Sequence, residues 1–388
     1  MLGVARRSPR SLAVAAAVAA VLVVGGVLLL ILRPGAVVAP IAAAAEPTPS
    51  RPATTPSPSP TPTPSVPAPA TIPSPTPTPL IPGVADLTGM RVSDALAHRL
   101  PIAVLIDDNR IARPQSGFNG ASIVYQAPAD GGETRYMMVF QEGESRVVGP
   151  VRSGRSYFIH WLSESRAAVA HYGGDRVSRI YLAVNDGKLL TDIDALRTTG
   201  KPFHRISSRN APHNAYTNTA ALRTVIPALK GPALMPVELA RRPFVDESAL
   251  GARGGRQAIT VPYRTGVIRY AYDRATNVYR RSVDGRTQVD PADRKPVTTR
   301  NVVVLFMSFR IDSKIEPGHA RPVLGAIGTG KALVFREGRL VVGTWRKSSE
   351  TALTKLYDPT GAELPLVRGR TFFQIVPDGT KVSPATVP

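Results

Sequence analysis

Short apolar runs alternate with helix-like stretches between about residue 85 and residue 230. Apolar runs of roughly four to eight residues, bounded by turn-forming residues, predict buried strands. They occur at 101–107 (PIAVLID), 122–128 (SIVYQAP), 134–141 (TRYMMVFQ) and 167–174 (AAVAHYGG). Apolar residues spaced three or four apart predict helices at 153–165, with Ser153 as N-cap, and at 218–229. Strands that alternate with helices are typical of an α/β domain, which we place at residues 85–230.

The pattern changes after residue 255, where β-prone runs follow one another and helical spacing fades. Tight turns such as DRATN and DG separate the runs, as in antiparallel sheets. The runs lie at 259–264, 266–273, 278–285, 300–309, 331–338, 339–345 and 371–377. We predict a mainly antiparallel β domain over 256–388, joined to the α/β domain by a connection at 231–255 that is rich in Pro, Arg and Gly.

The N-terminus carries the pattern of a membrane anchor. Residues 11–32 are 22 residues without a charge, and about 20 apolar residues span the hydrocarbon core of a bilayer. Three arginines precede them, so the positive-inside rule keeps residues 1–10 in the cytoplasm as a basic tail. We expect a single-pass cell-membrane protein whose C-terminal part is extracytoplasmic. The alternative is a protein secreted after cleavage near Ala45.

A proline-rich linker is predicted at residues 33–84. Its segment 46–82 contains 15 prolines in 37 positions, mixed with Thr and Ser. Proline removes the backbone donor and fixes φ, so polyproline II is favoured over helix or sheet. We therefore expect a disordered, semi-rigid stalk between the membrane and the first domain.

Charge and cysteine content narrow the range of partners. Residues 84–388 hold 43 Lys and Arg against 27 Asp and Glu, a net charge of +16. Such a charge attracts polyanions, and the expected topology favours a cell-wall polymer or a membrane-bound envelope enzyme over nucleic acid. The alternative is a generally basic surface without a particular ligand. The chain has no Cys, which excludes a thiolate nucleophile, a thiolate metal site and a lipid-modified N-terminal cysteine.

The stretch GAIGTGKA at 325–332 is close to a phosphate-binding P-loop. Gly330 and Lys331 match G-x-x-x-x-G-K-[ST], but Ala332 replaces the hydroxyl residue that would reach Mg²⁺. A P-loop also opens a helix, whereas Lys331 leads into a β-hairpin pattern. We interpret the stretch as a turn before a strand, and we expect no cofactor.

Candidate ligand-binding residues gather near the ends of predicted strands, where open α/β sheets place their ligands. On the first three strands they are Asp107, Arg113, Gln115, Ser116, Glu133 and Arg135. The carboxylate of Asp107 is suited to a cation or to general-base chemistry, or it pairs with a nearby arginine in a turn. Glu133 and Arg135 share one side of a strand, either facing a cleft or forming a local ion pair.

The segment GPVRSGRSYF carries the most specific signal. It brings Arg152, Ser153 and Arg155 to the start of a predicted helix. The N–H groups and dipole at that end favour an anion, and guanidinium groups bind carboxylate or phosphate as a fork. Further candidates are His171, His213 and Asn214. The histidines lack metal-ligand spacing, so we expect no metal site, and their roles as base, ligand or structural group stay open.

Several segments together resemble the YerB-type extracytoplasmic lipoproteins, a family with a two-part domain of unknown function. They are residues 101–141, VGPVRSGRSYF, AHYGG, APHNAYTN and GTGKALVFREGRLVVGTWRK, in the family's order over about residues 90–380. The resemblance implies an envelope-tethered protein, with some members near peptidoglycan synthesis, and a functional surface at the candidates above. It implies no catalytic role. The chain departs from the family at its start because, without a cysteine, its anchor has to be the 11–32 helix.

The sequence thus predicts a binding protein of the bacterial cell envelope. Its arginines would hold an anionic ligand such as a peptidoglycan or wall-polymer fragment, or a partner protein. The alternative is a hydrolase or lyase of envelope polymers, with Glu133 or Asp107 and a histidine as acid and base. A third hypothesis is an assembly factor that contacts a membrane enzyme, which predicts an apolar surface patch.

Overall fold

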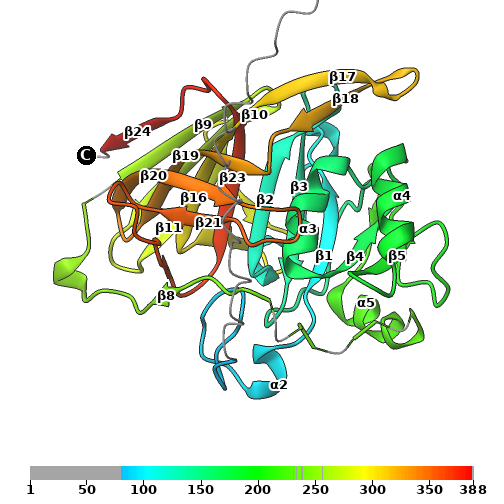
Figure 1. The fold of residues 1–388 in the computed structure, drawn as a ribbon, viewed down its shortest axis with the longest axis horizontal. Coiled ribbons are helices and arrows are strands. Elements are labelled where there is room, and N and C mark those ends of the chain that lie inside the picture. Colours follow the sequence, from blue (N-terminus) through cyan, green and yellow to red (C-terminus); the bar gives the residue numbers. More distant parts are fainter. Residues whose placement is uncertain (1–79, 230, 233, 237–238, 256, 387–388) are drawn as a thin grey trace, which may run out of the picture. The chain divides into compact units, whose positions relative to one another are not determined.

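The computed structural model describes residues 80–229, 231–232, 234–236, 239–255 and 257–386 (Figure 1). The predicted cytoplasmic tail, the predicted anchor at 11–32 and nearly all of the predicted linker lie outside the described residues. Within the described ranges, no helix is long and apolar enough to cross a membrane. These ranges all belong to one compact unit, Ile72–Pro388.

A ten-stranded mixed sheet runs through both predicted domains, in the order β21-β20-β19-β16-β23-β2-β3-β1-β4-β5. Its strands are β1 (Ile102–Asp107), β2 (Ile123–Pro128), β3 (Thr134–Phe140), β4 (Ala168–His171), β5 (Thr191–Asp194), β16 (Asn301–Met307), β19 (Gly328–Arg336), β20 (Arg339–Lys347), β21 (Lys355–Tyr357) and β23 (Thr371–Pro377). β2 and β23 pair in parallel, with Ile123 opposite Thr371. The chain on either side of residues 231–255 therefore contributes to one sheet (Figure 1).

Each face of the ten-stranded sheet buries its own core. Along β1, Val104 and Ile106 pack into one core, and Ala103 and Leu105 pack into the other. Successive side chains of a strand point to opposite faces, so a strand covered on both sides is apolar throughout. That is why the run at 101–107 is recognisable from its composition.

A smaller antiparallel sheet covers one face of the large sheet. It contains β9 (Gln257–Tyr263), β10 (Gly266–Asp273), β11 (Val278–Val283), β12 (Arg286–Thr287), β15 (Thr298–Thr299) and β24 (Ser383–Thr386). Ile259, Tyr270 and Tyr279 from this sheet share a core with Val304 and Phe372 of the large sheet. Burial alternates along β10, as expected for a strand with one face toward the core.

The helices are short and lie outside the sheets. They are α2 (Asp94–Ala97), α3 (Ile159–Ser165), α4 (Arg176–Asn185) and α5 (Thr219–Val225), with 3₁₀ turns at η1 (Arg110–Ala112), η2 (Phe118–Gly120), η3 (Asp130–Gly132), η4 (Ser156–Phe158), η5 (Pro227–Leu229) and η6 (Leu250–Ala252). Trp161 of α3 and Leu182 of α4 pack in the core opposite the small sheet. Leu222 of α5 packs on the same side as the small sheet.

Four two-stranded pairs complete the fold. They are β6 (His204–Arg205) with β7 (Ala215–Tyr216), β8 (Phe244–Val245) with β22 (Leu366–Val367), β13 (Val289–Asp290) with β14 (Lys295–Pro296), and β17 (Phe309–Glu316) with β18 (His319–Leu324). We call the β17–β18 hairpin, residues 309–324, the arm. Its strand β17 lies against α4.

The mixed sheet of the N-terminal region and the antiparallel strands of the C-terminal region confirm the predicted fold class at this level. The interpretation of GAIGTGKA as a turn before a strand is confirmed only for residues 325–327, because β19 begins at Gly328 and already includes Lys331. The predicted start of the helix at Ser153 was wrong. The backbone N–H of Gly154 donates to the Gly173 carbonyl at 2.8 Å, so helical structure begins only at Ser156.

Candidate functional site

Three predicted site residues converge on the carboxylate of Asp107, the last residue of β1. Arg135 lies directly opposite it in the β1–β3 pair, with Nη1 3.1 Å from Oδ1. Nε of Arg152 is 3.3 Å from Oδ2, and Nδ1 of His213 is 2.6 Å from the same oxygen. We call Asp107, Arg135, Arg152 and His213 the Asp107 cluster.

Backbone hydrogen bonds bring these distant segments together. The N–H of Asp107 donates to the carbonyl of Pro150 at 2.9 Å, and the N–H of Arg152 donates to that of Leu105 at 2.8 Å. The chain at 150–152 thus runs beside the end of β1. The N–H of Val151 in turn donates to the carbonyl of Ala215 at 2.6 Å, which places His213 at the same edge.

Asp107 is ionised in this setting. Burial alone would raise the pKa of its carboxyl group, but the positive charges of Arg135 and Arg152 outweigh burial and hold the pKa below its ordinary value. A carboxylate fixed in this state orients the groups around it. It is a poor general acid or base at neutral pH, because such a group needs a pKa near the working pH.

A second carboxylate, Asp130 at the start of η3, holds the neighbouring arginines. Its Oδ2 lies 2.5 Å from Nε of Arg155, and its Oδ1 lies 2.9 Å from Nη1 of Arg321. Arg321 comes from the arm, where it also pairs with Glu316 at 2.7 Å. The sequence reasoning missed Arg321 because no local pattern links the arm to residue 130.

Positive charge is crowded between these two carboxylates. Burial and the nearby Arg155 lower the pKa of Arg135 to about 10. Nε of Arg135 and the hydroxyl of the buried Tyr157 have no hydrogen-bond partner among the described residues. Tyr157 lies within electrostatic range of Arg155 and Arg135. Buried polar groups without partners are rare in folded proteins, so these two point to a ligand or a water.

Two other predicted residues belong to a separate network around Asp108. The side chain of Gln115 donates to Oδ1 of Asp108 at 2.9 Å, and Nε of Arg113 donates to the same oxygen at 3.1 Å. Gln126 donates to Oδ2 at 2.9 Å. Asp108 is fully buried, and both of its carboxylate oxygens accept hydrogen bonds from neighbouring side chains. We therefore assign this network a structural role.

The remaining predicted residues do not join the Asp107 cluster. Ser116 pairs through its backbone with Gly149, and the amide of Asn214 accepts from Arg205 at 2.5 Å. Oε2 of Glu133 is buried without a hydrogen-bond partner among the described residues. Ser153 is half-buried beside Arg152.

His171, at the end of β4, is engaged elsewhere. Its Nε2 lies 2.6 Å from Oδ1 of Asp192, and its Nδ1 lies 2.7 Å from the carbonyl oxygen of Gly173. Both partners are acceptors, so both ring nitrogens carry protons and the ring is an imidazolium. Burial opposes this charge, but the hydrogen bond and charge of Asp192 raise the pKa of His171 above 6.5. His171 is therefore a structural group of the sheet.

Replacing His171 with glutamine is expected to lower the free energy of unfolding by about 2 kcal/mol, because hydrogen bonds between charged groups are lost. When folding raises the pKa of a group, that group stabilises the folded protein fully at pH values below its pKa in the unfolded chain. This stabilisation is lost as the pH rises through its pKa in the folded protein. The difference between wild type and variant should therefore be complete below pH 6.5 and shrink in alkali. Urea unfolding across pH measures it, with exposed His204→Gln as control. A difference that grows with pH contradicts the assignment.

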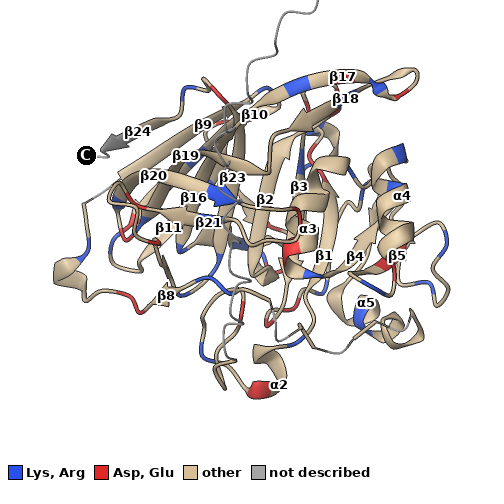
Figure 2. Ribbon diagram, in the orientation of Figure 1, with Lys and Arg blue, Asp and Glu red and all other residues tan. Residues whose placement is uncertain are grey.

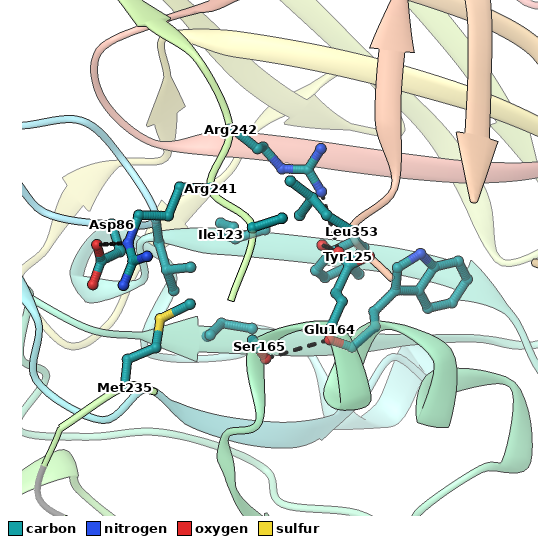
Figure 3. A pocket seen from close by; sticks show the side chains of 13 residues that line it. Asp86, Ile123, Tyr125, Glu164, Ser165, Met235, Arg241, Arg242 and Leu353 are labelled. Carbon is teal, nitrogen blue, oxygen red and sulfur yellow. Dashed lines mark hydrogen bonds and ion pairs between the residues drawn. The ribbon is translucent and has the colours of Figure 1, made fainter. Parts of the chain in front are cut away.

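The described cavities lie away from the Asp107 cluster. A cavity of about 20 Å³ opens between β2, α3 and the chain at 240–242 (Figure 3). Its lining includes Tyr125, Trp161, Glu164 and Arg242. A cavity of this size holds about one water. Among the described residues, no group of three His, Asp or Glu side chains is placed to hold a metal ion.

Charge of both signs is spread over the described residues (Figure 2). The Asp107 cluster and the Asp130 pairs stand out because three guanidinium groups, those of Arg135, Arg152 and Arg155, share two carboxylates. Arg321 is balanced by its own partner, Glu316. This arrangement leaves an excess of hydrogen-bond donors and positive charge, which suits an anion.

Two protein-family models match this chain, one in its N-terminal portion and one in its C-terminal portion. The model "Protein of unknown function (DUF3048) N-terminal domain" matches residues 87–231, and the corresponding C-terminal domain model matches residues 259–373. YerB of Bacillus subtilis (strain 168), named as a candidate lipoprotein, is 30% identical over 300 residues, which are 76% of this chain and 86% of YerB.

A crystal structure of the YerB protein from Bacillus subtilis is also similar in fold. It has a TM-score of 0.68 at 27% identity and covers 78% of this chain and 99% of that chain. The family resemblance predicted from the motifs is thereby confirmed. In this chain, one sheet joins the portions matched by the N-terminal and C-terminal models. The chain belongs to the DUF3048 family of proteins of unknown function.

Proposed function

We propose that this protein is an extracytoplasmic binding protein of the bacterial cell envelope that holds an anionic ligand at Arg135, Arg152 and Arg155. In this proposal residues 11–32 anchor the chain as a single membrane span, and the proline-rich residues 33–84 form the stalk. The similarity to YerB, whose name describes a lipoprotein, supports a location at the membrane. The chain has no cysteine, so in this proposal the membrane span takes the place of a lipid-modified cysteine.

The observation that carries the proposal is the excess of guanidinium groups over carboxylates. Nε of Arg152 lies 3.3 Å from Oδ2 of Asp107, but it makes no hydrogen bond to the described residues. The side chain of Arg152 is 25% exposed. A guanidinium that is held beside one carboxylate and still has a donor to offer suits a carboxylate or phosphate ligand.

The ligand class follows from the proposed location. Peptidoglycan stem peptides carry carboxylates, and other wall polymers carry phosphates, so both offer the planar or tetrahedral oxyanions that a guanidinium fork binds. Nucleic acid is not expected on the outer side of the membrane. We therefore propose an anionic cell-wall fragment as the ligand, and a membrane-bound envelope enzyme as the alternative partner.

Replacing Arg152 with glutamine is expected to weaken binding to purified cell-wall sacculi about tenfold to hundredfold, since hydrogen bonds to charged groups contribute about 1.5–3 kcal/mol. Asp107 keeps Arg135 and His213 as partners in this variant, so the fold should persist. Arg155→Glu is a poorer choice because it would place a second carboxylate against Asp130. Co-sedimentation of the unit 72–388 with sacculi, before and after removal of their anionic polymers, measures the effect.

Arg310→Gln is the matched control, because Arg310 is a well-exposed arginine that pairs with an aspartate, Asp312. Equal binding by Arg152→Gln and wild type would refute the anion site. Binding that disappears with the anionic polymers and with moderate salt would assign the interaction to the general charge of the surface.

The Asp107–His213 contact supports a second candidate function. A carboxylate that binds Nδ1 at 2.6 Å orients the imidazole and leaves Nε2 available to accept a proton, as in hydrolases. In this alternative, His213 is the general base of a hydrolase or lyase. Asp107 then orients the ring, because its lowered pKa does not suit an acid–base role. Release of soluble fragments in the sacculus assay would favour this function.

A further inference from the structure

The outward side of helix α4 carries an apolar stripe that the described residues leave uncovered. Val177, Ile180 and Val184 are 39%, 54% and 58% exposed. Their spacing of three and four residues puts them on one side of the helix. Leu182 is buried on the opposite side, against the sheet.

A fourth exposed aliphatic side chain lies near the start of α4. Leu196 is 63% exposed. Its Cδ1 would lie 3.2 Å from a Cβ added at Gly173, two residues before Asp175, the N-cap of α4. The stripe borders the end of the ten-stranded sheet, because β5 is the outermost strand there (Figure 1).

The exposed charges on the helix itself are basic. The only charged residues within α4 are Arg176 and Arg179, both exposed (Figure 2). The N-cap carboxylate of Asp175 is buried and accepts from the N–H of Ser178 at 2.7 Å. Beyond the helix lie exposed Lys188 and exposed Asp186. Glu316 of the arm accepts from the N–H of Arg176 at 3.4 Å and is paired with Arg321.

Apolar side chains flanked by arginines on one exposed helix face suit a surface that is both anionic and apolar beneath its charges. The interface of an anionic bilayer has this chemistry: aliphatic side chains enter the boundary of the acyl chains while arginines stay at the headgroups. A partner protein could also bind here, but its surface would need acidic and apolar groups placed to match this helix. Charge complementarity therefore favours the lipid surface.

We propose that α4, with Leu196, docks on the anionic surface of the membrane. This inference rests on the proposed anchor, because a tether keeps the unit at a high effective concentration near the bilayer. A short helix with three exposed aliphatic side chains, together with Leu196, is then sufficient for reversible docking. In the docked state, the tether and α4 together fix which side of the protein faces the cell wall.

The experiment uses the full chain reconstituted in vesicles. Because the chain has no cysteine, the variant Ile180→Cys can be labelled at that position alone with an environment-sensitive fluorophore. With vesicles of equal parts phosphatidylglycerol and phosphatidylcholine, we expect a blue shift and quenching by nitroxide-labelled lipids. Both signals should decrease with phosphatidylcholine alone, with added salt, and in a background carrying Arg176→Gln and Arg179→Gln.

The matched control is Val342→Cys, on strand β20, where the valine is 49% exposed. Equal quenching at positions 180 and 342, or none at position 180, overturns the docking proposal. Flotation of the chain with the vesicles in high salt tests the anchor separately. A chain that floats without quenching at position 180 refutes docking and leaves the anchor intact, whereas a chain that fails to float refutes the anchor.

Discussion

Replacing Arg281 with methionine is expected to lower the free energy of unfolding by about 4 kcal/mol, because several buried oxygens would lose their only cationic donor. Arg281, on β11, is 1% exposed. It donates to the hydroxyl of Tyr270 at 3.1 Å, to Oε1 of Gln126 at 2.9 Å and to the hydroxyl of Tyr136 at 2.9 Å. It also donates to Gln288.

The surroundings of Arg281 explain the size of this effect. Its guanidinium carbon lies between 5.5 and 5.8 Å from the ring centroids of Phe118, Tyr136, Tyr270 and Phe372. Gln126 and Tyr136 belong to the ten-stranded sheet, whereas Arg281 belongs to the small sheet. The side chain therefore joins the two layers, and methionine would fill the volume without replacing the hydrogen bonds.

Urea unfolding measures the loss, and the neighbouring residue on the same strand supplies the control. Arg280 is half-exposed and pairs with Asp273 at 2.6 Å, so Arg280→Met should cost about 0.5 kcal/mol. Equal losses for the two variants would mean that Arg281 acts only through its position in the strand. A loss near zero at Arg281 would mean that its buried partners find other donors.

The Asp107 cluster was accessible to sequence reasoning because its signals are local. Strand ends at Asp107 and Arg135 follow from apolar runs, and pairing of neighbouring strands brings the two residues opposite each other. The GPVR segment and the APHN segment added Arg152 and His213. The same reasoning did not separate Asp107 from Asp108, which follows the end of β1. It therefore did not show that Gln115 and Arg113 bond to Asp108 instead of Asp107.

Long-range pairing left no such signal. Nothing in residues 123–128 indicates that they pair with residues 371–374, because a buried parallel strand shows only a continuous apolar run. The arm brings Arg321 to Asp130 across 190 residues of chain in the same way. Both features depend on how the two portions pack, which the order of residues along one segment does not encode.

Helix α4 was not predicted, although its sequence carries signals for a helix. Val177, Ile180 and Val184 follow helical spacing, and Asp175 is a strong N-cap residue. The side that these three residues mark is exposed, whereas Leu182 faces the core. The exposed apolar side is the feature on which the docking proposal is based.

Replacing Glu164 with glutamine is expected to lower the free energy of unfolding by about 3–5 kcal/mol, because it leaves buried cations without a counter-charge. Glu164 lies in the last turn of α3 and is buried. Oε2 lies 3.1 Å from Nζ of Lys347, and Oε1 lies 3.1 Å from a terminal nitrogen of Arg242. Lys347 is itself 1% exposed. Glutamine is nearly the same size, so the loss reports charge rather than packing.

Further bonds tie this carboxylate to both portions of the chain. The backbone N–H and the hydroxyl of Thr354 each donate to Oε2 at 2.8 Å, and the hydroxyl of Tyr125 donates to Oε1 at 3.0 Å. The partly exposed Glu363 forms a glutamate–lysine pair of similar length, with Lys355 at 3.0 Å. Glu363→Gln is therefore the matched control, with an expected cost of about 0.5 kcal/mol.

The pH dependence provides an independent check on Glu164. Burial would raise the pKa of its carboxyl group, but Lys347 and Arg242 outweigh burial and lower the pKa below 4.5. When folding lowers the pKa of a group, that group stabilises the folded protein fully at pH values above its pKa in the unfolded chain. This stabilisation is lost as the pH falls through its pKa in the folded protein. Urea unfolding should thus separate wild type from Glu164→Gln fully at neutral pH and progressively less below pH 4.5. A gap that stays constant in acid would show that the cost comes from lost packing or altered hydrogen bonds, and that the buried charge itself contributes little.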